Sequence, residues 1–248
     1  MPSIGIIVAL PAEARSLVRQ RLWFDSVHEM ADGHWLAVAG AGPEQARVAA
    51  DKLLDREVDG LVSWGCAAGL ARHLAPGHLV MAEHVVGENG RQHFTDTQWR
   101  ERLSSRLSPE VTRHVAPIRE SRDVVSTRRD KAHLHQISGH AALDMESAAI
   151  GRVAEDQGLP FLVVRAIADH ADMDFPRAVT RALNPRGDVR MTTLLGQLAL
   201  HPAELGALMA LGRAFGAAMK TLHQVRRAAG ADFGFMPEMG RKTSQVSS

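Results

Sequence analysis

The sequence predicts a single α/β domain with a central mixed, mostly parallel sheet, flanking helices and extra helices at the C-terminus. Two observations predict this class. Apolar runs that suit strands buried on both faces alternate along the chain with segments of helical periodicity. The last third of the chain differs, since the two segments expected there have helical spacing. A repeated strand-then-helix order favours a sheet that carries helices on both faces.

Each element has its own signal. Ile4–Leu10 is a continuous apolar run, and Pro11–Arg21 is expected to be helical because proline suits a first helical turn. Asp96 or Thr97 can cap a helix, and Phe161–Ala168 is the clearest buried strand. The other expected elements are the strands Trp35–Ala39, Gly60–Ser63 and Leu79–Val86 and helices near 43–55, 128–137, 146–158, 191–200 and 202–227.

One domain is expected to span residues 1–228, including the C-terminal helices. Residues 229–248 are rich in Gly, Ser, Lys and Pro, which is typical of a flexible tail. The 248 residues are 45% hydrophobic, enough for a substantial core without disulfides or a structural metal. Cys66 is the only cysteine, so no intramolecular disulfide can form.

Charge and patterning exclude several partners. The net charge of +1 gives no global electrostatic case for nucleic-acid binding. The first apolar run is short, lacks a basic region before it and is followed at once by Glu13 and Arg15, so we interpret it as a core strand and not as a signal peptide. No apolar run reaches the length needed to span a bilayer, and we expect a cytoplasmic protein.

Candidate ligand-binding segments follow the predicted strands, because α/β sheets bind ligands at the carboxyl ends of their strands. These segments are Pro11–Arg15, Gly40–Gly42, Gly65–Gly69, Asp169–Asp172 and the helix start Asp144–Ser147. The two glycine segments could bring backbone N–H groups to an anion, or they could be plain tight turns.

Two acidic residues are more informative. Asp169 ends a fully apolar strand, where partial desolvation would raise its proton affinity, although it could instead cap a following turn. Glu146 lies beside small residues, where a carboxylate is either exposed at a helix start or held for a purpose. The 13 histidines show no metal-ligand spacing, and no metal site is expected.

Four segments, in order, carry a resemblance to a known family. They read GIIVALPAE (5–13), SWGCAAGL followed by LAPGHLV (63–80), LDMESAA (143–149) and VVRAIAD (163–169). They resemble the opening strand, glycine turn, ribose-binding segment and acid-bearing strand of methylthioadenosine/S-adenosylhomocysteine nucleosidases. On these motifs the chain is identified as a member of the purine nucleoside phosphorylase and nucleosidase superfamily, whose fold it is expected to share.

The resemblance implies roles for individual residues. Asp169 would protonate the purine N7 as general acid, and Glu13 would activate the attacking water. Glu146 would accept a hydrogen bond from the ribose 2′-hydroxyl, and Met145 would pack against the sugar. Val125 corresponds to a position that contacts adenine through its backbone.

Some positions depart from the family pattern, and others are expected to bind the substrate or phosphate. Cys66 and Ala168 each replace a serine, and Val124 replaces an aromatic residue that stacks on the base. Ala67 and Arg165 are also expected to bind substrate. For a phosphate nucleophile, the expected binding residues are Arg15, Gly42 and Gly65. Either phosphate or water is the expected co-substrate, with no cofactor.

A narrower resemblance covers nearly the whole chain. Asp123–Glu146, Asn184–Asp188 and His201–Phe215 are similar to the hopanoid-associated nucleoside phosphorylases, thought to remove adenine from adenosylhopane in hopanoid biosynthesis. The alternatives are a methylthioadenosine/S-adenosylhomocysteine or futalosine-type nucleosidase, and a non-catalytic nucleoside-binding module. The resemblance and the frequency of symmetric dimers together imply a homodimer.

The last expected helix bears on a lipid-linked substrate. Its apolar face is flanked by Arg213, Lys220 and Arg227, a pattern that could place the helix on an anionic membrane surface. The same pattern is typical of a helix that packs into the core and exposes a basic stripe, and both alternatives stay open.

Overall fold

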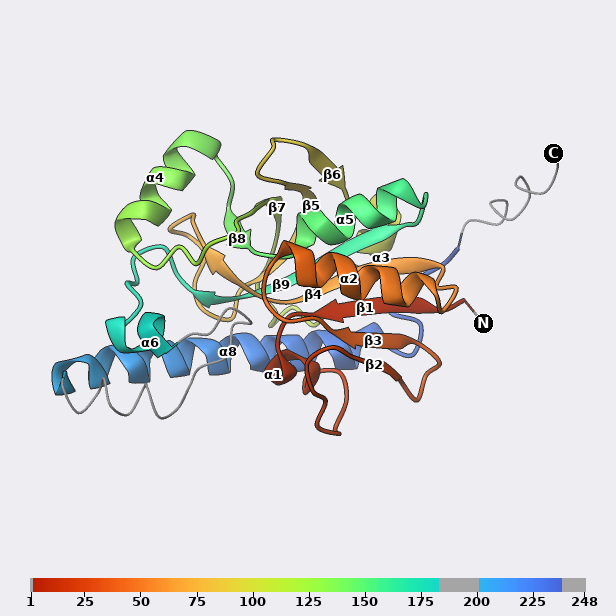
Figure 1. Ribbon diagram of the computed structural model, residues 1–248, viewed down its shortest axis with the longest axis horizontal. Coiled ribbons are helices and arrows are strands. Elements are labelled where there is room, and N and C mark those ends of the chain that lie inside the picture. The colour runs from red at the N-terminus through yellow and green to blue at the C-terminus, as the bar shows by residue number, and fades with distance from the viewer. Residues whose placement is uncertain (1, 183–200, 238–248) are drawn as a thin grey trace.

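The computed structural model describes residues 2–182 and 201–237, and a mixed sheet lies at its centre (Figure 1). The described strands are β1 (Ile4–Val8), β2 (Ser26–Glu29), β3 (Trp35–Val38), β4 (Gly60–Gly69), β5 (Leu79–Val86), β6 (Gln92–Phe94), β7 (Arg113–Glu120), β8 (Ala142–Asp144) and β9 (Phe161–Asp169). Five of the pairings described are parallel and four are antiparallel. The predicted α/β class with a mixed sheet and flanking helices is confirmed.

Part of the sheet closes into a ring, because its strand pairings lead from β4 back to β4. β4 pairs with β8, β8 with β7, β7 with β5, β5 with β9, and β9 again with β4. These five strands form a barrel-like ring, and β1, β3 and β2 extend from β4 as an open sheet. The carboxyl ends of β1, β4 and β9 therefore meet at one edge, because these three strands run parallel to one another.

Alternation along β1 shows how the core is divided. Ile4, Ile6 and Val8 pack into one hydrophobic cluster with buried residues of α8 (Leu205–Ala229). Ile7 points the other way, into a second cluster with α2 (Pro43–Leu54) and α5 (Ser147–Asp156). Figure 1 shows α8 running along one side of the sheet, with α2 and α5 on the other. Both faces are covered, which is why these strands are continuous apolar runs.

The remaining helices lie between strands or, for α6 and η1, between β9 and α8. They are α1 (Pro11–Ala14), α3 (Thr97–Ser105), α4 (Arg128–Ser138), α6 (Arg177–Ala182) and the 3₁₀ turn η1 (Pro202–Glu204). The predicted cap of α3 is confirmed at Asp96, whose side chain accepts a hydrogen bond of 2.7 Å from the Trp99 N–H.

Three features differ from the sequence-based expectations. The first helix ends at Ala14 and not at Arg21, since the Ser16 hydroxyl donates to the Glu13 carbonyl and competes with continued helix. Strand β4 continues to Gly69, so the expected glycine turn is strand. Strands β2, β6 and β7 were not predicted, because their many charged and polar residues leave no apolar run in the sequence.

The expected tail begins later than its composition suggested. Phe233 and Phe235 are buried in the core, and the Trp99 indole N–H donates to the Phe233 carbonyl at 2.8 Å. Arg106 forms an ion pair with Asp232. The boundary predicted at residue 229 is therefore wrong by several residues, and the rest of the predicted tail from residue 238 lies outside the described residues.

Helix α8 packs into the core through Ala214, Ala218 and Leu222, whereas its basic stripe is exposed. Much of the apolar face of α8 is therefore used for packing against the core, as one of the two alternatives for this helix expected. Within residues 2–182 and 201–237, no helix is long and apolar enough to cross a bilayer. The predicted helix at 191–200 lies outside the described residues.

Candidate active site

A cavity of about 740 Å³ opens where β1, β4 and β9 end. Its polar lining includes carboxylates from three segments of the chain: Glu13, then Asp144 and Glu146, then Asp169. Its apolar lining comes mainly from α6 and α8, with Val179, Leu208, Leu211 and Phe215. Such a cavity suits a ligand that has one polar end and one hydrophobic end.

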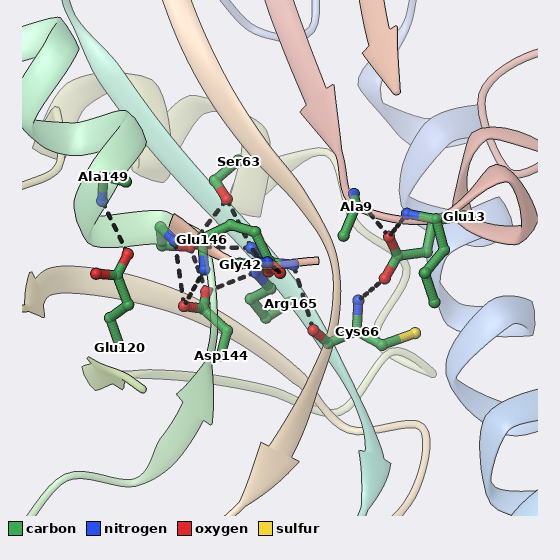
Figure 2. Close-up of polar contacts among 12 residues, drawn as sticks. Ala9, Glu13, Gly42, Ser63, Cys66, Glu120, Asp144, Glu146, Ala149 and Arg165 are labelled. Carbon is green, nitrogen blue, oxygen red and sulfur yellow. Dashed lines mark hydrogen bonds and ion pairs between the residues drawn. The ribbon is translucent and has the colours of Figure 1, made fainter. Parts of the chain in front are cut away.

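Glu13 projects from the short helix after β1 and is held by three backbone N–H groups. Its Oε2 accepts hydrogen bonds from Ala9 and Leu10 at 3.0 and 2.9 Å, and its Oε1 accepts one of 2.8 Å from Cys66 (Figure 2). The side chain is buried, and burial raises the pKa of Glu13 against the opposing effect of Arg165. A fixed carboxylate of raised proton affinity is suited to take a proton.

Arg165 lies beneath the cavity and links the carboxylates. Its guanidinium is 2.8 Å from Asp144 Oδ2 and 3.3 Å from Glu146 Oε2, and it donates to the Ser63 hydroxyl at 2.8 Å. Figure 2 shows this network, with Glu13 on the far side of Arg165 from Asp144. Arg165 is 1% exposed, so its charge is compensated by the carboxylates and not by water.

Gly65 makes this arrangement possible. A β-carbon at this position would lie 2.5 Å from Glu13 Oε1 and 2.7 Å from an Arg165 nitrogen. The residue was expected to bind phosphate in a turn, but it lies within β4 and allows Glu13 and Arg165 to approach the strand. The requirement for glycine is thus one of close approach.

Glu146 follows β8 and faces the cavity. Its Oε1 accepts a hydrogen bond of 3.1 Å from the Gly42 N–H, and its Oε2 is bonded to Arg165. Burial raises the pKa of Glu146 to about 7, although Arg165 lowers it. Gly42 was expected to bind phosphate, and its N–H is instead used to orient this carboxylate.

Asp169 ends β9 on the other side of the cavity and is 3% exposed. Its Oδ2 is 2.5 Å from the ammonium of Lys131, whereas its Oδ1 has no hydrogen-bond partner among the described residues. Burial raises the pKa of Asp169 to about 6, with Lys131 opposing the shift. An acid of raised pKa that lines a ligand cavity can donate a proton.

Comparison with known proteins agrees with this geometry. Residues 3–185 match the sequence profile of the phosphorylase superfamily, which covers most of the chain. The chain belongs to the phosphorylase superfamily. The prediction that it is an enzyme of this superfamily is thereby confirmed.

Two relatives in the phosphorylase superfamily have similar sequences. A 5′-methylthioadenosine/S-adenosylhomocysteine nucleosidase of Mycobacterium bovis is 28% identical over 228 residues, covering 69% of this chain and 87% of that protein. One from Shewanella halifaxensis is 26% identical over 163 residues, covering 56% and 69%.

Two solved structures show the same fold. Futalosine hydrolase of Helicobacter pylori has a TM-score of 0.67 at 16% identity, covering 92% of this chain and 96% of that chain. A 5′-methylthioadenosine/S-adenosylhomocysteine nucleosidase of Neisseria meningitidis, in complex with methylthio-immucillin-A, has a TM-score of 0.66 at 18% identity, covering 91% and 98%. The superfamily fold is therefore shared over nearly the whole chain.

Most of the residues expected to form the site do line the cavity. Those that do are Glu13, Cys66, Ala67, Val124, Val125, Met145, Glu146 and Asp169. The other expected residues, Arg15, Gly42, Gly65 and Arg165, are not among those that line it, and Arg15 is exposed just after α1. Burial raises the pKa of the Cys66 thiol well above its usual value, which supports a packing role over a nucleophilic one.

The sequence analysis did not single out Lys131 or Glu120, and it placed Asp144 in a candidate segment without giving it a role. Lys131 lies in a helix that is otherwise polar and exposed. Asp144 is in the matched LDMESAA segment and could have been found there as the partner of Arg165. Glu120 ends β7 and accepts a hydrogen bond of 2.8 Å from the Ala149 N–H, at the open N-terminus of α5.

Glu120 gives a stability prediction. Burial raises the pKa of Glu120 from 4.5 to about 7, so the folded state binds this proton more tightly than the unfolded state. The stabilisation from that proton is fully present below about pH 4.5 and is lost as pH rises through about 7. We expect Glu120→Gln, which keeps an acceptor for Ala149, to stabilise the protein at pH 8 by on the order of 3 kcal/mol.

Chemical denaturation of wild type and Glu120→Gln at pH 5 and pH 8 measures this difference. The exposed Glu101→Gln on α3 is the matched control, and it should leave the free energy of unfolding nearly unchanged. A loss of stability in Glu120→Gln at pH 8 would show that the carboxylate is favoured at this position.

Proposed function

We propose that this enzyme hydrolyses the N-glycosidic bond of an adenine nucleoside. The observation that carries the proposal is the placement of Glu13, Glu146 and Asp169 around one cavity. The first two carboxylates lie on either side of Arg165, and the third lies at the end of the strand that supplies Arg165. Relatives named as 5′-methylthioadenosine/S-adenosylhomocysteine nucleosidases support the substrate class.

The residues divide the reaction between them. As the bond from C1′ to the base breaks, its electron pair goes to the purine, and Asp169 gives a proton to N7. Glu146 accepts a hydrogen bond from the 2′-hydroxyl and stabilises the positive charge that develops on the ribosyl ring. Water attacks C1′ while Glu13 takes its proton, so the products are adenine and the free sugar.

Electrostatics favour water over phosphate as the nucleophile. The Glu13 carboxylate occupies the backbone N–H groups of Ala9, Leu10 and Cys66, which would otherwise be available to an anion. Arg165 is already paired with Asp144 and Glu146. Among the described residues that line the cavity, Arg122 is the one cation, and it pairs with Glu88 at the surface. A phosphate dianion would meet several carboxylates and no unpaired arginine there.

Release of adenine from purified protein tests the proposal. The substrates are 5′-methylthioadenosine, S-adenosylhomocysteine, adenosine and adenosylhopane, each with and without phosphate. We expect adenine from at least one adenine nucleoside at a rate independent of phosphate. Release that requires phosphate would make the enzyme a phosphorylase. Binding of adenine nucleosides without any release would favour a binding module.

The pH dependence follows from the two titrating groups. Asp169, with a pKa of about 6, must be protonated, so activity falls as pH rises through 6. Glu146, with a pKa of about 7, must be ionised, so activity rises through 7, and the raised pKa of Glu13 acts in the same direction. We therefore expect a bell-shaped profile of kcat/KM with its maximum between about pH 6 and 7. A flat profile from pH 5 to 9 would contradict this assignment.

The apolar wall favours a second, narrower candidate, adenosylhopane. The cavity is also lined by apolar side chains that a bulky hydrophobic 5′ group could contact: Phe175, Val179, Leu208, Leu211 and Phe215. A series of 5′-alkylthioadenosines of increasing length tests this candidate: kcat/KM should rise with chain length. A fall beyond methyl would favour small, soluble substrates.

Two further proposals accompany the lipid-linked substrate. The exposed Arg213, Lys220 and Arg227 could attach α8 to an anionic surface, and changing all three to Gln should then abolish co-sedimentation with anionic liposomes.

The expected homodimer is checked by the molar mass in solution.

A further inference from the structure

Lys131 is the one buried residue that α4 contributes to the described structure. Its side chain is 0% exposed, while the helix is otherwise polar and largely exposed. A buried ammonium is costly unless it is paired and hydrogen-bonded. A lysine at this position therefore has a partner that compensates the cost.

The partners all belong to the end of β9 and the loop after it. Lys131 Nζ is 2.5 Å from Asp169 Oδ2 and donates to the carbonyls of His170 and Met173 at 3.2 and 2.8 Å. It also lies 5.5 Å from the ring centre of Phe175. Two hydrogen bonds and one ion pair therefore hold the ammonium against the loop after β9.

This contact makes the two oxygens of Asp169 unequal. Oδ2 forms the ion pair with Lys131, whereas Oδ1 has neither an ion pair nor a hydrogen bond among the described residues. Asp169 lines the cavity, so the unpartnered oxygen is the one available to a ligand. The ion pair with Lys131 is formed through the other oxygen, Oδ2.

We propose that Lys131 is a positioning residue that holds Asp169 by Oδ2, presents Oδ1 to N7 of the base, and stabilises the carboxylate left after proton transfer. The inference rests on the proposed nucleoside cleavage. The step is balanced: the proton on Asp169 moves to N7, the base leaves with the glycosidic electron pair, and Asp169 becomes an anion beside an existing cation. Lys131 itself neither gains nor loses a proton.

The charges around Asp169 give the expected effect on pH dependence. The charged or titratable groups that act on it are Lys131 from α4 and His170 and Asp174 from its own loop. Lys131 and His170 lower the pKa of Asp169, and Asp174 raises it. Removing the positive charge at position 131 should therefore move the alkaline limb of activity to higher pH, by about one unit or more.

The experiment compares Lys131→Gln and Lys131→Met, which remove the charge, with Lys131→Arg, which keeps it. Arg129→Gln is the control, since it removes an exposed charge from the same helix. With an adenine nucleoside, the neutral variants should lose at least about tenfold in kcat and shift the alkaline limb upward. Lys131→Arg should lose activity over the same alkaline pH range as the wild type. Neutral variants that fold but show no shift in this pH range overturn the proposal.

A substrate whose leaving group needs no proton separates positioning from folding. With 4-nitrophenyl riboside the loss in the neutral variants should be at least about tenfold smaller than with adenine. Equal losses on both substrates would mean that Lys131 only maintains the structure.

A structure of the wild type with adenine tests the inference without any variant or turnover. N7 should lie within hydrogen-bond distance of Asp169 Oδ1, with Lys131 still on Oδ2. Contact of N7 with Oδ2, or a displaced Lys131, overturns the proposal. Failure of the wild type to release adenine would instead count against the proposed function, and this structure would still decide the role of Lys131.

Discussion

Replacing Asp169 with Asn is expected to lower kcat for adenine release by about 10² to 10⁴-fold while leaving nucleoside affinity within a few-fold. The amide would keep the shape of the side chain and a carbonyl oxygen beside Lys131, but it has no acidic proton for N7. Adenine release and calorimetric binding of a nucleoside analogue measure the two effects separately. The loss of one charge beside a buried lysine should also lower stability, so a thermal melt accompanies both.

Asp172→Asn is the matched control. Asp172 lies in the same loop, but its side chain is 58% exposed and it is paired with Arg72 at the surface. This variant should turn over adenine nucleosides like the wild type. Wild-type rates in Asp169→Asn would remove Asp169 from the mechanism.

Replacing Gly65 with Ala is expected to abolish activity and to destabilise the fold by about 1–3 kcal/mol. The new methyl group would lie 2.5 Å from Glu13 Oε1 and 2.7 Å from an Arg165 nitrogen. Neither side chain can move away freely, because both are buried and each has several hydrogen-bond partners. The substitution must therefore displace the proposed base, the cation beneath it, or the strand.

Gly69→Ala supplies the control within the same strand. There the added methyl would meet Ile167 at 3.4 Å and the Asp169 carbonyl oxygen at 3.5 Å, which are ordinary van der Waals contacts. We expect Gly69→Ala to keep most of its activity and stability, as measured by adenine release and thermal melting. An active Gly65→Ala with an unchanged melting temperature would mean that the Glu13 and Arg165 arrangement is not required.

The strands that could be predicted from sequence are those buried on both faces. β1 and β9 are continuous apolar runs because α2 and α5 cover one face of the sheet and α8 covers the other. β7 could not be recognised, since it carries Arg113, His114, Pro117 and Glu120 in eight residues. Its place in the ring is fixed by pairing with β5 and β8, which only the tertiary fold provides.

The same contrast holds for the site. Glu13, Glu146 and Asp169 lie in recognisable motifs, and the structure brings all three to the cavity. Lys131 has no motif, and its helix is polar in sequence, so no pattern distinguishes it from its exposed neighbours. Its partner becomes visible only when the loop after β9 folds against α4.

The phosphate-binding expectation shows why glycine patterns are ambiguous. Gly42 and Gly65 can each bring backbone close to an anion, and in this fold the anions are Glu146 and Glu13 of the chain itself. The sequence shows where the backbone approaches closely but does not show what approaches it.

The central claim is that Glu13 directs water, and not phosphate, to C1′. The most direct test is cleavage of the best adenine nucleoside in the presence of ¹⁸O-labelled phosphate, with the sugar product identified by mass spectrometry. We expect a free sugar without label, formed at a rate that phosphate does not change and that Glu13→Gln abolishes. A sugar 1-phosphate carrying ¹⁸O would contradict it.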